Sequence, residues 1–183
     1  MFLFKPKKPV LNEARSETQD NVDLQIINKM NQEFAVSLDL NETLKTALQR
    51  IIARLEAQAA NVFLINNKIK KFECIASINQ DHLDEYKLEL TDGVMAKAVD
   101  QRKCIRVGNV RKDVREIAEF YFDLDNKTNF TTYSVLCSPL IVSDECIGVI
   151  HCLNKKTNNK LFEENDRKLL ETLSGPAALA INN

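Results

Sequence analysis

The spacing of apolar residues changes twice along this chain, and the order of those changes limits the folds that it can adopt. Residues 22–34 and 40–55 carry apolar side chains three and four positions apart, which is the spacing of one helix face. Residues 60–153 instead contain short apolar runs separated by turn residues, which is typical of strands. The segment 162–182 returns to helical spacing. Helices at both ends of a strand-rich centre predict an α+β domain with a largely antiparallel sheet.

Two hairpins and two short helices are expected within the strand-rich centre. Asn66-Asn67-Lys68 separates one pair of strands, and Ser143-Asp144-Glu145 separates the other. A short helix is expected at 92–103, and residues 113–129 are expected to begin as a helix and to end as a polar loop. The expected strands are 60–66, 69–77, 104–108, 133–142 and 146–153.

The chain divides into three expected segments. Residues 1–20 are polar and lack an apolar period, which is typical of a disordered tail or linker. Residues 21–38 are expected to form a helix for dimerisation or signalling, because their apolar stripe has no obvious partner within the domain. Residues 39–183 are expected to form the folded domain, and Asp39 followed by Glu42 favours a capping box at its start.

The charge and hydropathy of the chain exclude several classes of partner. Its 25 basic and 26 acidic residues give a net charge of −1, whereas nucleic-acid binding favours a basic excess. No apolar run approaches the roughly 20 residues that cross a bilayer. The start, MFLFKPKKPVL, places its charges after the apolar residues, the reverse of a signal peptide. We therefore expect a cytoplasmic protein that binds neither nucleic acid nor membrane.

The ionisable residues show no arrangement typical of a catalytic or metal site. The five cysteines include no C-x-x-C pair, and most of them lie in apolar strand-like runs, as buried free thiols do. His151 is expected to be a sheet histidine that is buried or faces a helix, and the carboxylates Asp123 and Asp125 are expected in a turn or helix start, where capping and solvation explain them. The chain contains no G-x-S-x-G, P-loop or G-x-G-x-x-G motif. No catalytic residue, metal ligand or resident cofactor is therefore predicted.

Five pieces of the sequence occur in the order in which a known family carries them. They are GVMAKAV, CIRVGNV, TNFTTYSVLCSPL, ECIGVIHCLNKK and FEENDRKLLETLS. Together with ANVFLIN they cover roughly residues 40–182, and in this order they resemble a GAF domain, a small-molecule sensory module. The resemblance implies a central antiparallel sheet with helices on both faces, here with an N-terminal helical extension.

A further motif resembles the GAF domains of cyclic-nucleotide phosphodiesterases and cyanobacterial adenylyl cyclases. Asn154-Lys155 is followed, after a gap, by Phe162, three residues and Asp166, while Arg167 stands where the family has Glu. By this resemblance the four matching residues form a structural clasp: Asn154, Lys155, Phe162 and Asp166. An ion pair between Lys155 and Asp166 is expected to tie the last helix to the sheet, with Asp166 near the helix N-terminus.

The resemblance also implies a purine-nucleotide pocket between the sheet and the two short helices, with a cyclic nucleotide as its candidate ligand. The positions that match its lining are Met95, Ala96, Asn109, Tyr121, Phe130, Thr131 and Thr132. The Thr132 hydroxyl is the favoured contact, since it can donate to or accept from a base or phosphate. The chain departs from the family at Ala96–Val99, Arg106–Asn109 and Thr128–Phe130, so the ligand identity does not carry over.

Three functions follow from these expectations. The first is a non-enzymatic sensory domain that binds a small molecule, forms a homodimer, and controls a partner or an effector domain beyond Asn183 through its terminal helices. The second is a ligand-free GAF fold used for dimerisation or protein interaction, which a pocket filled by Met95 and aromatic side chains would favour. The third is a free methionine sulfoxide reductase, with Cys104 and Cys137 near the pocket.

Overall fold

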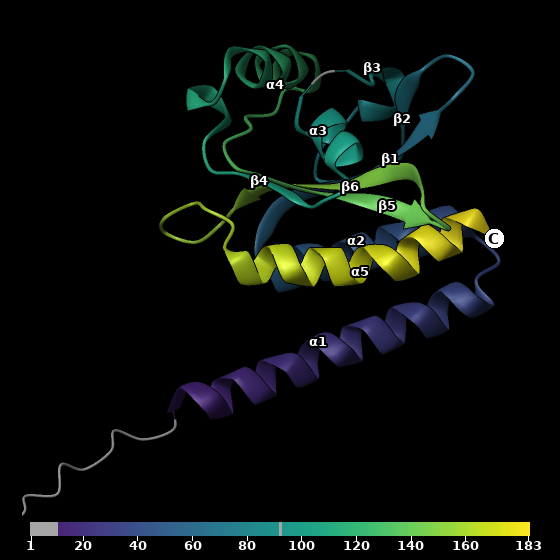
Figure 1. Ribbon diagram of the computed structural model, residues 1–183, viewed down its shortest axis with the longest axis vertical. Coiled ribbons are helices and arrows are strands. Elements are labelled where there is room, and N and C mark those ends of the chain that lie inside the picture. The colour runs from purple at the N-terminus through teal and green to yellow at the C-terminus, as the bar shows by residue number, and fades with distance from the viewer. Residues whose placement is uncertain (1–10, 92) are drawn as a thin grey trace, which may run out of the picture.

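A six-stranded antiparallel sheet organises the chain, with helices packed against both of its faces (Figure 1). The computed structural model describes residues 11–91 and 93–183. Its α-helices are α1 (Leu11–Val36), α2 (Leu40–Leu55), α3 (Gly93–Gln101), α4 (Arg115–Thr128) and α5 (Glu164–Asn182). Its strands are β1 (Ala57–Asn66), β2 (Lys71–Ile78), β3 (Lys87–Glu89), β4 (Ile105–Val107), β5 (Val135–Val142) and β6 (Glu145–Lys155). Two short 3-10 helices, η1 (Leu83–Glu85) and η2 (Val110–Lys112), lie in the connections. The expected fold class is confirmed.

The strands are ordered β3-β2-β1-β6-β5-β4, and neighbouring strands are antiparallel. Strand β6 therefore lies inside the sheet, between β1 and β5. In this register Asn61 of β1 and Cys137 of β5 both lie opposite His151 of β6. Residues directly opposite each other project from the same face of a sheet, so these three side chains share one face.

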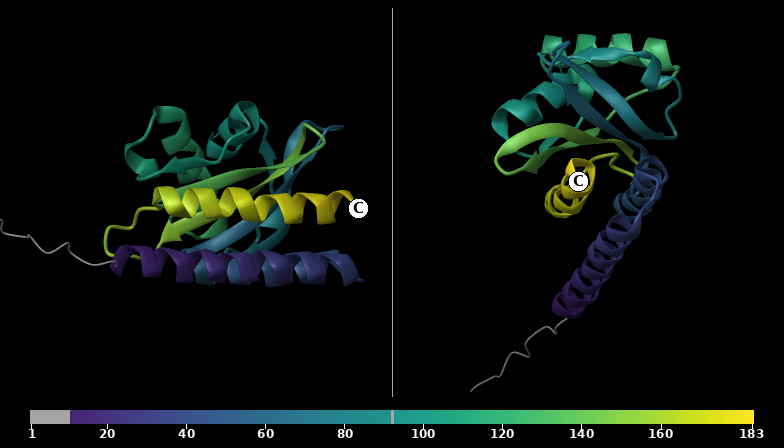
Figure 2. Two further views of the ribbon diagram at one scale, coloured as in Figure 1. Left: turned by 60° about the horizontal axis from the view of Figure 1, so that its bottom comes forward. Right: turned by 90° about the vertical axis from the view of Figure 1, so that its right-hand side faces the viewer.

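Helices α2 and α5 cover one face of the sheet, and α3 and α4 lie on the other (Figures 1 and 2). The apolar core beneath α2 and α5 includes Leu48, Ala60, Leu136, Ile150 and Leu170. The core toward α3 and α4 includes Phe63, Met95, Tyr121, Val135 and Val149. Alternate residues of a strand project to opposite faces, so the central strands supply both cores.

Helix α1 is longer than the sequence pattern predicts. It begins at Leu11, so residues 11–20 are helical where a disordered tail or linker over residues 1–20 was expected, and residues 1–10 lie outside the described residues. The segment 11–20 contains Leu, Ala, Arg, Gln and two Glu, all of which have high helix propensity. A helix that is anchored farther along the chain can therefore extend into this segment without an apolar face.

Helix α1 packs against α2 and α5 of its own chain (Figure 2). Met30 is fully buried there. Arg54 of α2 donates to Asp23 of α1 over 2.6 and 3.1 Å, and Arg50 forms a second ion pair with Glu33. The prediction that the apolar stripe of this helix has no partner within the domain is therefore wrong, while its role in dimerisation stays a prediction.

Gly148 permits the close approach of β6 to β1 and provides a test of this pairing. A Cβ atom at this position would lie 2.1 Å from the carbonyl oxygen of Phe63. We predict that Gly148→Ala lowers the free energy of unfolding by about 3 kcal/mol or more, because the backbone must move to relieve the overlap. Urea unfolding followed by circular dichroism measures the change.

Gly175→Ala is the matched control for this substitution. An added Cβ at Gly175 meets nothing within 4 Å. The control should change the free energy of unfolding by less than about 1 kcal/mol. Equal effects at the two positions would contradict the pairing of β1 with β6.

Candidate functional site

Three of the residues predicted to line a ligand pocket are buried between the sheet and α4. Met95 of α3 and Tyr121 of α4 are 0% exposed, and Thr132, which precedes β5, is 1% exposed. Their side chains fill the layer in which the family resemblance places a ligand. The structure therefore gathers these three residues in one buried layer.

The other predicted lining residues lie around the edge of this layer. Ala96 lines a groove of about 460 Å³ between α3 and the start of α4. The Asn109 side chain accepts a hydrogen bond from the Arg111 backbone N–H (3.0 Å) and thereby caps η2. Phe130 is partly buried at the edge of the core, and Thr131 is exposed. Three of the seven predicted residues are thus buried together, and the other four lie around the edge of their layer.

The His151 imidazole lies in the middle of this layer and lacks one hydrogen bond. It is fully buried, and its Nε2 lies 2.7 Å from the Tyr121 hydroxyl. The two rings stack with their centroids 5.8 Å apart, while Phe63 packs edge-on at 6.1 Å. The Nδ1 atom has no hydrogen-bond partner among the described residues. Burial lowers the pKa of His151 to about 3, so the imidazole is neutral near pH 7.

A series of buried amides and hydroxyls lies on the same sheet face as His151. Asn61 donates to Gln80 (2.8 Å), and Gln80 donates to the Thr128 hydroxyl of α4 (3.2 Å). The Ser77 hydroxyl donates to the side-chain oxygen of Asn61 (2.7 Å). These hydrogen bonds connect β1, β2 and α4, so α4 is held over the sheet by polar as well as apolar contacts.

The Asp125 carboxylate of α4 accepts three hydrogen bonds from the connections that flank the helix. Two come from the Thr132 backbone N–H (2.8 Å) and the Thr132 hydroxyl (2.6 Å), and the third comes from the Arg111 guanidinium. Asp125 is only 5% exposed. The Thr132 hydroxyl, the favoured ligand contact by resemblance, is thus bonded to the protein's own carboxylate.

Two features of this layer differ from what the sequence predicts. Asp125 is not solvated in a turn or helix start, because α4 continues to Thr128 and the polar loop expected there is helical. His151 is a buried sheet histidine, as expected. That its Nδ1 atom lacks a hydrogen-bond partner among the described residues is a result of tertiary packing, which no sequence pattern predicts. The sequence signal that could have predicted the burial of Asp125 is its helical spacing, because it lies four residues after Tyr121 on the same helix face. The buried face of α4 consists of Ile117, Tyr121, Leu124, Asp125 and Thr128.

The Lys155 ammonium group joins β6 to both helices on the other face of the sheet. Its Nζ lies 3.0 Å from Asp166 Oδ1 and donates to the Leu55 carbonyl at the end of α2 (2.8 Å). The second Asp166 oxygen accepts from the Glu163 backbone N–H (2.8 Å) at the start of α5. The ion pair expected between Lys155 and Asp166 is therefore present, and it ties α5 to the sheet.

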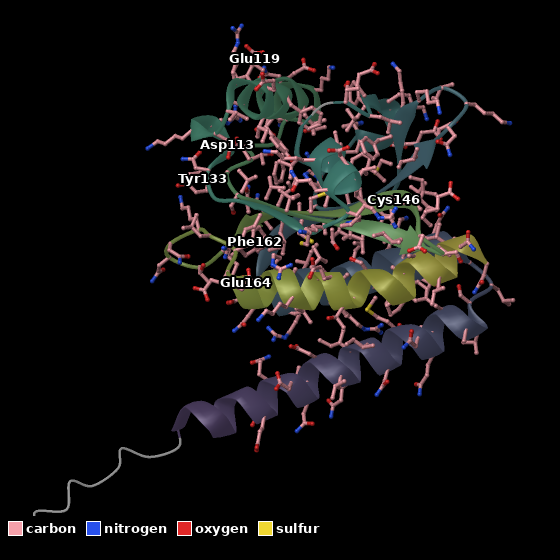
Figure 3. All side chains as sticks on the ribbon, in the orientation of Figure 1. Asp113, Glu119, Tyr133, Cys146, Phe162 and Glu164 are labelled. Carbon is pink, nitrogen blue, oxygen red and sulfur yellow. The ribbon has the colours of Figure 1, made fainter. Side chains whose placement is uncertain are left out.

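Asn154 and Phe162 lie at the same end of β6. The Asn154 side-chain oxygen accepts from the Tyr133 N–H (2.6 Å), and its amide nitrogen donates to the Thr131 carbonyl (2.7 Å). Phe162 is 2% exposed and belongs to the core beneath α2 and α5. Figure 3 shows Tyr133, Phe162 and Glu164 toward one edge of the molecule. The four residues of the expected clasp thus make their contacts within the protein.

Comparison with known proteins places this arrangement in a family. The chain matches the family model for the GAF domain over residues 37–182. The chain belongs to the GAF family. It is 23% identical over 140 residues to the "Probable 3',5'-cyclic phosphodiesterase pde-5" of Caenorhabditis elegans, which covers 70% of this chain and 18% of that protein. The resemblance seen in the sequence is therefore confirmed at the level of the family.

Solved structures show the same fold at low sequence identity. The GAF domain from a phosphoenolpyruvate-protein phosphotransferase of Coxiella burnetii gives a TM-score of 0.75 at 16% identity, covering 87% of this chain and 92% of that one. A free methionine-R-sulfoxide reductase from Neisseria meningitidis, in complex with its substrate, gives a TM-score of 0.70 at 15% identity, covering 87% and 88%. This GAF domain thus shares its fold with both a domain of a larger protein and an enzyme.

The two cysteines considered for reductase chemistry lie on opposite faces of the sheet in this GAF domain. Cys104 belongs to the core beneath α2 and α5, whereas Cys137 belongs to the core toward α3 and α4. Burial, followed by the nearby Glu171 carboxylate, raises the pKa of Cys104 to about 12. Burial also raises the pKa of Cys137. Both thiols are therefore protonated near pH 7, which is the less nucleophilic form.

Within residues 11–91 and 93–183, no three His, Cys, Asp or Glu side chains are grouped so that they could hold a metal ion. No helix of those residues combines the length and the apolar character that crossing a bilayer requires.

The ion pair of Lys155 predicts a large loss of stability when the lysine is removed. In Lys155→Met the carboxylate of Asp166, which is 8% exposed, loses its cation, and the Leu55 carbonyl loses a donor. We predict that the free energy of unfolding falls by about 3 kcal/mol, as measured by urea unfolding, because an unpaired buried charge is left behind. The control Lys168→Met alters an exposed lysine of α5 and should change the free energy of unfolding by less than about 0.5 kcal/mol. A change below about 1 kcal/mol in Lys155→Met would contradict the clasp.

The buried neutral His151 makes the stability of the GAF domain depend on pH. Its pKa is about 3 in the fold and about 6.5 in the unfolded chain, so between these values only the unfolded state binds the proton. This contribution to stability is complete above about pH 6.5 and is lost as the pH falls toward 3. We predict that the wild type loses about 2 kcal/mol more than His151→Leu between about pH 7.5 and pH 5, measured by urea unfolding.

His82 provides the control for this pH dependence. It is exposed, and its hydrogen bond with Glu85 raises the pKa of its imidazole, which is the opposite direction. The variant His82→Gln should therefore keep the loss of stability in acid. The same pH dependence in His151→Leu and the wild type would mean that folding does not lower the pKa of His151.

Proposed function

We propose that this GAF domain is a non-enzymatic regulatory module that binds a small molecule between the sheet and α4, with His151 as a contact. The observation that carries the proposal is the His151 Nδ1 atom, which is fully buried and has no hydrogen-bond partner in the described structure. An unsatisfied buried polar atom costs about 1–3 kcal/mol. A ligand atom that bonds Nδ1 recovers this energy, so the site favours a ligand with a complementary polar group.

Tyr121 occupies the space that such a ligand would enter. Its ring stacks on the imidazole and its hydroxyl bonds Nε2. Helix α4 packs on α3 and η2 and forms the outer layer on this side of the sheet (Figure 1). Ligand binding therefore favours a second arrangement in which α4 carries Tyr121 away from His151. A cyclic nucleotide is our candidate ligand, because a purine offers hydrogen-bonding atoms and the Caenorhabditis elegans relative is named a cyclic phosphodiesterase.

Strand β6 links this site to the terminal helices. His151 faces α4, and farther along the same strand Lys155 holds α5 and the end of α2. Helix α1 packs against these same two helices. A change around His151 can thus be passed to α1 and α5, through which we propose that the domain controls a partner or an effector domain beyond Asn183.

Exposed apolar side chains on the terminal helices support self-association. Leu24 and Val36 of α1 are 56% and 79% exposed, and Leu179 of α5 is 58% exposed. We propose a homodimer that buries these side chains, since apolar surface favours contact with another apolar surface. We also propose a cytoplasmic location, where the five free thiols stay reduced.

Calorimetric titration of refolded, ligand-stripped protein with cyclic AMP, cyclic GMP and a small purine panel tests the proposed ligand site. We predict saturable binding to the wild type and a loss of affinity of about hundredfold or more in Tyr121→Phe/His151→Leu. This double variant removes both partners of one buried hydrogen bond. Its free energy of unfolding should therefore change by less than about 1.5 kcal/mol, so that lost binding is not lost folding.

A control variant and two contrary outcomes complete the binding experiment. His82→Gln alters the exposed histidine and should bind as the wild type does. Unchanged affinity in the double variant would place the ligand elsewhere. No binding across the panel would favour the second candidate, a ligand-free dimerisation or interaction module, which the full burial of Met95 and Tyr121 supports.

A free methionine sulfoxide reductase is the third candidate, since the Neisseria meningitidis structure shares the fold. The raised pKa values of Cys104 and Cys137 and their places on opposite faces of the sheet weigh against it. Thiol-dependent reduction of free methionine sulfoxide that is lost in Cys104→Ser or Cys137→Ser would establish this activity instead.

A further inference from the structure

The three donors around Asp125 are of the kinds that proteins use to bind small oxyanions. A backbone N–H and a hydroxyl of Thr132 approach the carboxylate at 2.8 and 2.6 Å, and the Arg111 guanidinium completes the set. Guanidinium and backbone N–H groups form strong hydrogen bonds to phosphate and carboxylate alike. The oxyanion that these donors bind here belongs to the protein itself.

This set of donors is buried at its base and open on one side. Asp125 and Thr132 are 5% and 1% exposed, whereas the Arg111 side chain is 35% exposed. The Arg111 guanidinium also lies 5.9 Å from the centroid of the exposed Phe122 ring, a weak contact that a shift of α4 can break. An anion from solvent can therefore meet Arg111 first, while Thr132 becomes available only when Asp125 leaves.

Asp125 shares the buried face of α4 with Tyr121, one turn earlier. Side chains at this spacing lie about 5–6 Å apart on one side of a helix. A movement of α4 that withdraws Tyr121 from His151 therefore also withdraws Asp125 from Arg111 and Thr132. Opening the space beside His151 and freeing the three donors are thus one event.

We propose that Arg111 and Thr132 form an anion-binding site that Asp125 occupies until a phosphate or carboxylate group of the ligand replaces it. The inference rests on the proposed function, because it uses the same movement of α4. It assigns a chemical class to the ligand: a polar group that bonds His151, and an anionic group about one helical turn away. A neutral ligand would leave Arg111 and the Thr132 donors without a partner, which disfavours it.

Asp125 is then an internal competitor of the ligand. The apparent affinity for an anion is reduced by the fraction of molecules in which the donors are free. Removing the carboxylate should therefore strengthen anion binding, whereas removing an exposed aspartate of the same helix should not. This difference assigns the anion response to the donors around Asp125.

The test uses Asp125→Ala in the full chain, with sodium formate and inorganic phosphate as probes. Formate restores the missing carboxylate, and phosphate represents the other class of oxyanion. We predict that at least one anion raises the Tm of Asp125→Ala saturably beyond sodium chloride of equal ionic strength. Titration calorimetry should show it binding about tenfold or more tighter than to the wild type. A response to formate alone indicates carboxylate ligands, and a response to phosphate indicates phosphorylated ones.

Asp123→Ala is the matched control, because Asp123 lies on the same helix, is exposed, and pairs with Lys127 instead. It should show no anion-specific response, and adding Arg111→Met to Asp125→Ala should abolish the response. A folded Asp125→Ala protein that responds to neither anion beyond sodium chloride overturns the proposal.

A second variant covers the case in which Asp125→Ala does not fold. Asp125→Asn keeps the shape of the side chain and removes its charge. Anion affinity in folded Asp125→Asn that does not exceed that of the wild type overturns the proposal equally. Because neither probe is a purine, this experiment can succeed where the purine panel fails, and the reverse.

Discussion

Strand β6 is paired along both edges and covered on both faces, and the rest of the structure depends on this double burial. Each polar group that the strand contributes must find a partner inside the protein or stay unsatisfied. Lys155 finds the Asp166 carboxylate and a backbone carbonyl, whereas His151 keeps one ring nitrogen without a bond in the described structure. The same strand thus fastens the helices on one side of the sheet and leaves an unmet hydrogen bond on the other.

The layer beneath α4 shows how tight packing and the proposed sensory role can belong to one molecule. Three sets of polar contacts hold α4 in place over the sheet. The hydroxyl of Tyr121 bonds His151, Thr128 bonds Gln80, and Asp125 bonds Thr132. In the function proposed above, these contacts set the free energy that a ligand has to exceed, and selectivity arises from the groups that the ligand must replace.

Periodicity predicts most of the fold because burial repeats with the geometry of each element. The short apolar run along 146–153, which follows turn residues, indicates a strand, and the family resemblance adds the order of the elements. Asp125 shows where such reasoning stops. Helical spacing can place Asp125 on the buried face of α4, but its partners Arg111 and Thr132 come from the two connections that flank the helix, so no local pattern encodes these hydrogen bonds. The start of α1 at Leu11 also depends on tertiary contacts farther along the helix.

Helix α1 is attached by partly exposed ion pairs as well as by apolar contacts with the core beneath α2 and α5. Its ion pairs, Asp23 with Arg54 and Glu33 with Arg50, join side chains that are 22–31% exposed, and Met30 is its fully buried apolar anchor. Charges at a surface are screened over about 8 Å at physiological ionic strength, whereas apolar burial is not. Raising the ionic strength therefore weakens the two ion pairs of α1 and leaves its apolar contacts unscreened. The salt concentration of the solvent therefore affects how firmly α1 is attached, independently of any ligand beneath α4.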